Sequence, residues 1–315
     1  MKSNATHPKH AIIQNYFQSL FYNNMRQLLL IFFALTLLSC STHKRPGKNE
    51  TFHFFTFRDK IDWTKYDRSI SDNDKELYAQ KIKDQFSYFF NEQAITGEGH
   101  TLKDFINKLH FIDLNGDKNL DIIYEGWSGS ESDNTQIFIN KNGHITKVFE
   151  AFQYIESLDF DKNEKLISFT ILDFGCCAEY IEYETKFSVT DNFETSILLQ
   201  RAKPSFTTPP QVLFSEPVKF TTISDEYTLR SSPIIDDTST VIYDAPNKGN
   251  AIAKFSKNSS GQAWAEQKDN TGRTWWLVEM NPIEKLSYNL VYYKDTIPPR
   301  EIGWMSKRYL GSGKE

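Results

Sequence analysis

The sequence has few of the residues that would place it quickly in a functional class. Of its 315 residues only 3 are cysteine and 7 are histidine. Three cysteines cannot form the framework of a small disulfide-stabilised domain, and no metal-ligand spacing is found among His53, His100, His110 and His144. Lys and Arg number 36 against 41 Asp and Glu, for a net charge of −5. Because general nucleic-acid binding needs a basic surface, we expect no nucleic-acid partner.

Residues that build packed cores are abundant by comparison. The chain is 39% hydrophobic, 15% aromatic and 24% charged, a balance that argues against a disordered polypeptide. A length of 315 residues allows about two domains of ordinary size. The proline-rich stretch 204–210 separates two patterns rich in β-forming residues, so we expect domains at 51–210 and 212–315.

The N-terminal segment contains one apolar run, Leu28–Leu38, which follows Arg26 and is too short to span a membrane as a helix. The run ends in Leu37-Leu38-Ser39-Cys40, which resembles the signal of bacterial lipoproteins. In that family the chain is cut before the cysteine, which is then lipidated. The resemblance implies a signal peptide at 1–39 and a lipid anchor on Cys40. An ordinary secretory signal with a chance cysteine is the alternative.

The flanking residues extend this interpretation. The segment before Met25 is not a normal start of a signal peptide, so we expect Met25 to be the true start. Removing residues 1–39, which carry three basic and no acidic side chains, changes the net charge to −8. Residues 40–50 form a short basic tether, and Ser41 is compatible with the outer membrane by resemblance to other lipoproteins. We therefore expect an envelope protein that contacts the membrane through its lipid and faces the periplasm.

The rest of the chain is predicted to be mainly β with helices near its N-terminus, an α+β fold class. Apolar residues at helical spacing predict helices over 71–93 and 102–109, the first capped by one of Ser71, Asp72 and Asn73. The core-facing residues of the first helix are Leu77, Ile82, Phe86, Phe89 and Phe90. Strands are expected at 122–124, 136–139, 145–149, 166–172, 180–189 and 196–199. Asn142-Gly143 between two of them is a strong hairpin signal.

An acidic loop follows the second helix. Side-chain oxygens recur at alternate positions of the segment 111–121, and Gly116 gives the backbone freedom that such a turn needs. Calcium requires six or more oxygen ligands, which alternate residues of a tight loop can direct to one centre. The candidate ligands are Asp113, Asn115, Asp117, Asn119 and Asp121, with Asn119 contributing its backbone carbonyl.

The loop is not an EF-hand, because Tyr124 stands where that motif requires a glutamate. It resembles instead the Asp-x-Asn-Gly-Asp-x-x-x-Asp loop of FG-GAP and VCBS repeats, which form blades of β-propellers and bind calcium between two strands. The resemblance implies a structural calcium ion and one or two blade-like units in an antiparallel β scaffold. The segment 159–163 is interpreted as a decayed second copy without metal. A hairpin turn whose carboxylates are satisfied by their own backbone is the alternative for the first loop.

Cys176 and Cys177 are adjacent in the sequence. In an oxidising periplasm such a pair can close a vicinal disulfide. Two small buried side chains are an alternative interpretation, and a redox or metal sensor is another.

The C-terminal domain carries four motifs in order, at Leu229–Pro233, Gly249–Lys254, Gly272–Val278 and Ile302–Leu310. They resemble the Leu-x-Arg-Ser-x-Pro opening, second strand, central Gly-x-x-Trp-x-x-Val and closing Gly-Trp-Val segments of bacterial Src-homology-3-like domains. The resemblance covers about 95 residues and implies a small β-barrel. The insert 281–300 is longer than the usual hairpin of that family. Related modules bind peptides or cell-wall strands through aromatic grooves.

Alternation along the tryptophan strand predicts which rings are available to a ligand. If Trp276 and Val278 face the core, then Trp275 and Leu277 face outward or into a groove. The predicted ligand groove consists of Trp264, Trp275, Tyr292, Trp304 and Tyr309, with Trp304 also a candidate core anchor. The expected partner is a peptide or peptidoglycan.

No enzyme signature is convincing. Gly126-Trp-Ser-Gly-Ser130 lacks the Gly-x-Ser-x-Gly spacing of a nucleophile elbow, and Glu182 and Glu184 are interpreted as one solvated strand face. The sequence therefore favours a non-catalytic, lipid-anchored envelope protein. The enzyme alternative is a cell-wall hydrolase targeted by its C-terminal domain. It predicts two convergent carboxylates of raised pKa in a cleft within residues 51–200.

Overall fold

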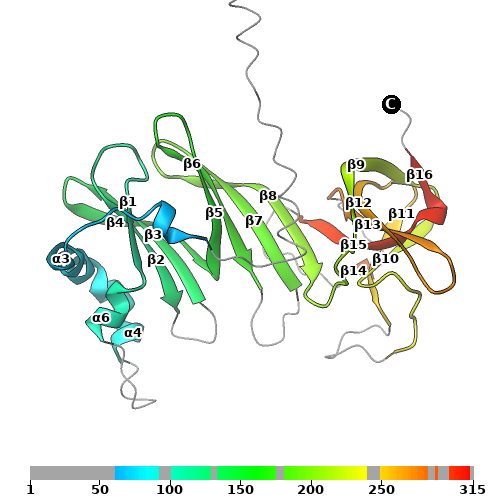
Figure 1. The fold of residues 1–315 in the computed structure, drawn as a ribbon, viewed down its shortest axis with the longest axis horizontal. Coiled ribbons are helices and arrows are strands. Elements are labelled where there is room, and N and C mark those ends of the chain that lie inside the picture. Colours follow the sequence, from blue (N-terminus) through cyan, green and yellow to red (C-terminus); the bar gives the residue numbers. More distant parts are fainter. Residues whose placement is uncertain are drawn as a thin grey trace, which may run out of the picture. The chain divides into compact units, whose positions relative to one another are not determined.

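The computed structural model describes residues 61–91, 101–128, 133–174, 181–239, 249–282, 288–289 and 298–312. Within these ranges the protein is mainly β, with short helices confined to the N-terminal part, as the sequence predicts (Figure 1). None of the helices found there has the length and apolar character needed to cross a membrane. The predicted signal peptide, Cys40, the pair Cys176 and Cys177, and Tyr292 lie outside the described residues.

The predicted helix over 71–93 is divided into three consecutive segments: α3 (Asp72–Ile82), the 3-10 turn η2 (Lys83–Phe86) and α4 (Ser87–Asn91). Ser71 is the N-cap, and its hydroxyl accepts a hydrogen bond from the amide of Asp74 at 3.1 Å. Leu77 is 57% exposed, so its assignment to the core stripe is wrong. The buried stripe runs instead through Ala79, Ile82 and Phe86, which follow one another at helical spacing, and Leu77 lies off that stripe.

The second predicted helix is shorter than expected. It is α6 (Leu102–Ile106), which begins with a capping box between Thr101 and Asp104. Strand β1 (Leu109–Ile112) follows directly, so the apolar residue at 109 belongs to a strand and not to the helix. A further 3-10 turn, η1 (Trp63–Lys65), precedes α3.

The first sheet has the strand order β1-β2-β3-β4, and every pair in it is antiparallel. Its further strands are β2 (Asp121–Trp127), β3 (Asp133–Lys141) and β4 (His144–Phe152). Asn142 and Gly143 form the tight turn between β3 and β4, and both have a positive φ, 54° and 89°. This confirms the predicted hairpin.

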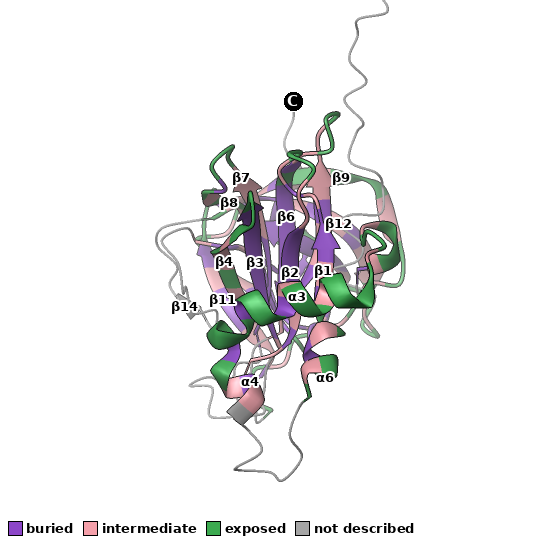
Figure 2. Ribbon diagram, turned by 90° about the vertical axis from the view of Figure 1, so that its left-hand side faces the viewer, coloured by how far each residue is buried: buried purple, intermediate pink, exposed green. Residues whose placement is uncertain are grey.

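The two faces of this sheet are covered by different partners. Ile122 and Tyr124 of β2 pack with Phe86 and Phe105 of the helical segments, and Figure 2 shows α3 and α6 in front of the strands. Ile123, on the opposite face of the strand, packs instead with residues of a second sheet, including Ile155 and Phe169. The first sheet is therefore the middle layer between helices and the second sheet.

The second sheet has the order β16-β9-β12-β13-β15-β8-β7-β6-β5, with β10 pairing β11 and β15, and β14 pairing β11. Its strands are β5 (Tyr154–Phe160), β6 (Leu166–Asp173), β7 (Ile181–Val189), β8 (Thr195–Pro204), β9 (Leu213–Thr222), β10 (Glu226–Arg230), β11 (Ala251–Ser256), β12 (Ser260–Lys268), β13 (Thr274–Met280), β14 (Tyr288–Asn289), β15 (Arg300–Ser306) and β16 (Leu310–Ser312). No pairing between described strands closes this sheet into a barrel. The Src-homology-3-like barrel and the propeller-blade units therefore stay predictions.

The second sheet consists of two halves, strands β5 to β8 and the strands from β9 onward, and β15 joins them. It pairs antiparallel with β13 over 302–306, meets β10 at Trp304, and pairs with β8 at Arg300 and Glu301. The pairing with β8 is the one parallel pairing among the described strands. The core follows the same continuity, because Ile181 and Tyr183 of β7 belong to a buried cluster with Trp276 and Val278 of β13.

Candidate functional site

The predicted calcium loop forms the connection between β1 and β2. Asp113 accepts hydrogen bonds from the amides of Gly116 and Lys118, at 2.7 and 2.8 Å. Asn115 and Asp117 each accept one from the amide two residues later. The loop is thus folded by its own side chains, as the alternative hairpin interpretation expects. A carboxylate oxygen has two lone pairs, so each oxygen that accepts one amide keeps acceptor capacity for a cation.

Asp121 differs from the other loop carboxylates because it is fully buried. One of its oxygens accepts from the amide of Leu114 and the other from the amide of Asn140, both at 2.8 Å. Burial raises the pKa of Asp121 to about 7, opposed by these two amides and reinforced by the charges of Asp117 and Asp113. A buried negative charge with no basic partner is the setting in which a divalent cation gains most.

The second aspartate-rich turn lies beside the first. The carbonyl of Asn163 is 3.6 Å from the position that a Cβ would take at Gly116, and the amide of Leu166 donates to the carbonyl of Leu114 at 2.9 Å. In this turn Asp161 accepts from the amides of Asn163 and Lys165. Within the described ranges no group of three or more His, Cys, Asp or Glu side chains is arranged to hold a metal ion. The calcium site therefore stays a prediction about this pair of turns.

The expectation that Trp275 and Leu277 face outward is wrong. Trp275 is 1% exposed and Leu277 is fully buried, in a cluster with Trp304. Trp276 and Val278, on the other face, lie in a separate buried cluster. Strand β13 is therefore buried on both faces, and alternation separates two cores instead of a core from a surface.

The segment expected to be a linker between domains provides the second covering. The indole N–H of Trp304 donates to the carbonyl of Thr208 at 2.9 Å, and the amide of Thr208 donates to the carbonyl of Ser231 at 2.7 Å. Leu213, which begins β9 directly after this segment, packs against the cluster of Trp275 and Trp304. Because this segment lies over the tryptophans, neither Trp275 nor Trp304 can line an open groove, and both are withdrawn from the ligand-binding set.

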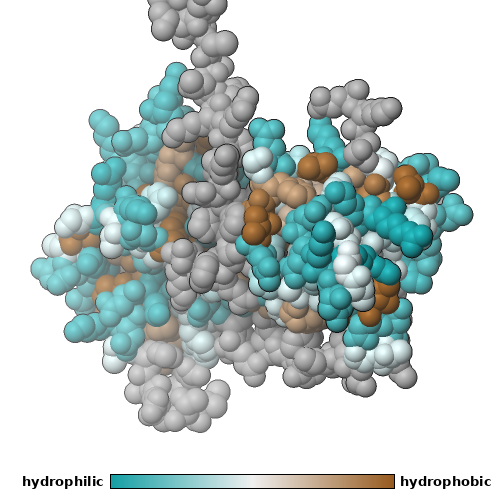
Figure 3. All heavy atoms as spheres, turned by 45° about the vertical axis from the view of Figure 1, so that its right-hand side comes forward, coloured by the Kyte–Doolittle hydropathy of each residue, from teal (hydrophilic) through white to brown (hydrophobic). Residues whose placement is uncertain are grey.

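Two aromatic residues of the predicted groove remain among the described residues, and Tyr292 lies outside them. Trp264 is half-buried, and its indole N–H donates to Glu279 at 3.0 Å. Tyr309 is 41% exposed and stands edge-on to Tyr227, with ring centroids 5.5 Å apart. On the face of the protein shown in Figure 3, apolar areas are small and separated by hydrophilic ones. Tyr309 is therefore the exposed aromatic among the described members of the predicted set.

Glu279 is the centre of a buried ionic network between the two halves of the second sheet. It is fully buried and accepts hydrogen bonds from Arg201 and Arg300, both at 3.3 Å, and from Gln262 and Trp264. Arg201 also contacts both oxygens of Glu184, at 2.9 and 3.0 Å. Burial raises the pKa of Glu184, and the charge of Arg201 opposes that rise. Glu182 and Glu184 are buried, so their assignment to a solvated face is wrong.

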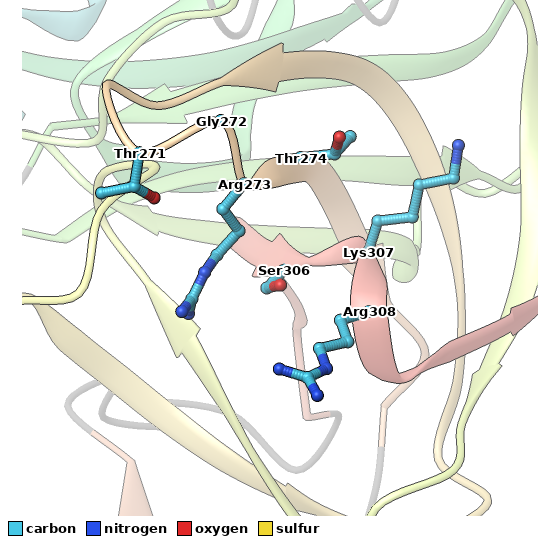
Figure 4. A pocket seen from close by; sticks show the side chains of 7 residues that line it. All are labelled: Thr271, Gly272, Arg273, Thr274, Ser306, Lys307 and Arg308. Atoms are coloured by element: carbon cyan, nitrogen blue, oxygen red, sulfur yellow. The ribbon is translucent and has the colours of Figure 1, made fainter.

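An open pocket of about 510 Å³ lies beside Tyr309, at the end of β13 and β15 (Figure 4). Its lining residues are Thr271, Gly272, Arg273, Thr274, Ser306, Lys307 and Arg308. The side chains of Arg273 and Arg308 extend to the same side of the pocket, whereas that of Lys307 points away. Lys307 forms an ion pair with Glu266 at 3.0 Å. No carboxylate among the described residues lies within ion-pair distance of Arg273 or Arg308.

Both walls of this pocket are held by hydrogen bonds. Asp269 accepts from the amides of Thr271 and Arg273 and from the indole of Trp275, at 2.9 to 3.0 Å. These bonds, with the hydroxyl of Thr271 the largest contribution, lower the pKa of Asp269 to about 2. On the other wall Tyr227 donates to the carbonyl of Ser306 at 2.5 Å. Hydrogen bonds within the protein therefore hold both lining segments of the pocket in position.

The sequence interpretation missed the pocket arginines, although both stand inside the motifs that it used. Arg273 follows Gly272 in the central motif, and Arg308 lies in the closing motif. The two arginines line one pocket because Trp275 of β13 pairs with Ser306 of β15. A search for basic residues within the quoted motifs would have found the two arginines, but their proximity depends on strand pairing.

Comparison with protein-family models, with curated protein sequences and with solved structures finds no match to this chain.

Proposed function

We propose that the chain is a non-catalytic lipoprotein of the bacterial cell envelope, anchored through Cys40 to the outer membrane and facing the periplasm. Its N-terminal region would be a scaffold of FG-GAP- or VCBS-like units stabilised by calcium. Its C-terminal region would be a Src-homology-3-like module that binds peptide or peptidoglycan. The lipid anchor rests on the lipoprotein-like signal ending at Cys40.

The observation that carries the ligand-binding part is the open pocket at the end of β13 and β15. It lies in the segments that resemble Src-homology-3-like domains, and its arginines have no acidic partner among the described residues. Unpaired guanidinium groups beside an exposed tyrosine are typical of a surface that binds a ligand, because Arg and Tyr dominate the energetics of interfaces. The ligand-binding proposal now rests on these arginines, because Trp275 and Trp304 of the predicted groove are buried.

The direct test is sedimentation of the full chain with purified, insoluble cell wall at low salt. A Cys40→Ala variant removes the proposed lipid, so that adhesion of acyl chains is not counted as binding to the wall. We expect the variant to sediment with the wall in a saturable manner. Failure of the Cys40→Ala variant to bind would reject the ligand assignment, whether or not the lipidated form sediments.

The calcium part is supported by the alternating oxygens of the first loop and by the burial of Asp121, whose hydrogen-bond partners in the described residues are two backbone amides. For a dissociation constant of about 10⁻⁴ to 10⁻³ M, calcium at about 10 mM would stabilise the fold by roughly 1.4 to 2.7 kcal/mol. Urea unfolding with calcium or chelator measures this difference. We expect Asp113→Asn to abolish it and Asp161→Asn, in the neighbouring turn, to retain it. Equal stability of the wild-type chain in both buffers would contradict the proposal.

The hydrolase alternative requires two convergent carboxylates. Within the described part of residues 51–200, burial raises the pKa of Asp121 and that of Glu184. They are held by different partners, Asp121 by two backbone amides and Glu184 by Arg201. They also stand in different sheets, on β2 and β7. These positions give the non-catalytic proposal its preference over a wall-acting enzyme.

A further inference from the structure

We propose that the pocket between Arg273 and Arg308 recognises a carboxylate of its peptide ligand. This inference rests on the proposed function, because it names the chemical group by which the C-terminal module would hold a peptide or the peptide part of peptidoglycan. It assigns the specificity to two arginines and not to an aromatic groove.

The charge of the pocket is the first argument. Three basic side chains line it, and Lys307 is engaged by Glu266. Glu266 accepts from the indole N–H of Trp276 at 2.9 Å and from Lys307 at 3.0 Å, and among the described residues it forms no ion pair with Arg273 or Arg308. Asp269 is occupied by the amides and the indole of its own hairpin. Two positive charges therefore remain without a carboxylate among the described residues, and an incoming anion would supply it.

The shape of the arginines is the second argument. A guanidinium presents its N–H donors in a planar fork that matches the two oxygens of a carboxylate. Arg308 lies 5.3 Å from the ring centroid of Tyr309, and Arg273 lies 5.8 Å from that of Trp275. These contacts restrict both side chains before a ligand arrives, which lowers the entropy cost of binding.

The surroundings favour a peptide over a free inorganic anion. Tyr309 is exposed beside Arg308, so an anion bound there would have a ring next to it against which its own carbon atoms can pack. The hydroxyls of Thr271, Thr274 and Ser306 complete the lining and suit the amide groups of a peptide backbone. A volume of about 510 Å³ is large enough for one or two residues of a peptide.

The test compares two peptides that differ only in the carboxylate. The probes are Nα-acetyl-Lys-D-Ala-D-Ala with a free C-terminal carboxylate and the same peptide with a C-terminal amide, titrated into the full chain by calorimetry. We expect the acid to bind at least about tenfold more tightly than the amide. Arg273→Gln and Arg308→Gln should each remove about that advantage, and Arg308→Lys should restore only part of it because lysine lacks the fork.

Lys257→Gln is the matched control, because it removes one exposed positive charge from the turn between β11 and β12. It should bind the acid peptide as the wild-type chain does. Equal affinity for acid and amide, equal loss in the control variant, or stronger binding of inorganic phosphate than of the acid peptide would overturn the inference.

Wall sedimentation with the Arg273→Gln/Arg308→Gln chain separates this inference from the proposed function. Retained wall binding by that variant would overturn the role of the pocket and leave the wall-binding proposal standing. Binding of the acid peptide by a wild-type chain that does not sediment with the wall would reject the wall ligand and leave the pocket assignment standing.

Discussion

Asp121 shows how a single residue makes the stability of this protein depend on pH. Its side chain is buried between β2 and the turn before it, and burial raises its pKa to about 7. The folded chain therefore retains a proton that the unfolded chain releases near pH 4. Between about pH 4 and pH 7 the folded chain binds one more proton than the unfolded chain. The free energy of unfolding therefore falls as the pH rises through this range.

We predict that Asp121→Asn flattens this dependence in calcium-free buffer. The amide costs a hydrogen bond at every pH, because it has one acceptor oxygen for two backbone donors. Between about pH 5 and pH 7.5 the wild type should lose about 2 kcal/mol of its free energy of unfolding relative to the variant. Urea unfolding at a series of pH values measures it. Parallel curves for the two chains would show that Asp121 does not titrate in that range.

Glu279 carries the second prediction at this scale. Glu279→Gln leaves Arg201 with Glu184 as its carboxylate partner and Arg300 facing a neutral amide, and the loss of these charged hydrogen bonds should cost about 1.5–3 kcal/mol. The control is Glu226→Gln, which breaks an exposed pair with Lys254 and should cost less than about 1 kcal/mol. Chemical unfolding of both variants gives the comparison. Similar losses for the two would mean that burial does not set the strength of the network.

Among the elements, β15 shows most clearly which structural features can be predicted from the sequence and which cannot. Trp304 is a core candidate in the sequence, and the structure confirms that it is buried. Gly303 precedes it. A Cβ at Gly303 would lie 2.7 Å from the carbonyl of Arg230, so the glycine allows β10 to approach. The pairing of β15 with β8 was not foreseen, because no local pattern encodes a partner about 100 residues earlier.

The helices and hairpins illustrate the same division between local and distant information. Ser71 as a cap and Asn142-Gly143 as a turn are short-range signals, and both were predicted. Strands β1 and β5 were missed, since each is short or lies next to a motif interpreted as a loop. The exposure of Trp275 was predicted wrongly because alternation along a strand shows that its faces differ, but not that each is covered.

At the scale of this strand, we predict that Gly303→Ala destabilises the chain by about 1–3 kcal/mol, because its methyl group would overlap the β10 backbone. Gly311→Ala is the control, since the nearest atom to its Cβ would be the γ2 methyl of the exposed Ile223, at 3.1 Å, and the backbone oxygen of Thr221 would be at an ordinary contact distance of 3.8 Å. Thermal unfolding of both variants measures the difference. A control that loses as much stability as Gly303→Ala would remove the argument from close approach.

At the scale of the whole molecule, the continuity of the second sheet predicts one cooperative unfolding transition. Residues of β7 and β13 share a buried cluster, and Leu172 of β6 packs with Trp275 and Trp304. Tryptophan fluorescence is weighted towards the C-terminal region, which holds four of the six tryptophans, whereas far-UV circular dichroism reports both regions. We expect the two signals to change at the same urea concentration.

A variant sharpens this test. Leu172→Ala removes a side chain of β6 that packs on the tryptophan cluster, and should lower the midpoint of both signals together, at a cost of about 2–5 kcal/mol. Two separate transitions, with only one of them moved by the variant, would contradict the prediction of a single cooperative unit.

The place of β15 in the order of synthesis has a consequence for folding. Its three partners, β8, β10 and β13, are all made before it. Until the ribosome has added residues 300–306, these strands present unpaired edges that could join to another chain. An unfinished chain of this kind would be open to edge-to-edge pairing with other chains, and a premature stop just before β15 would remove the strand that connects both halves of the sheet.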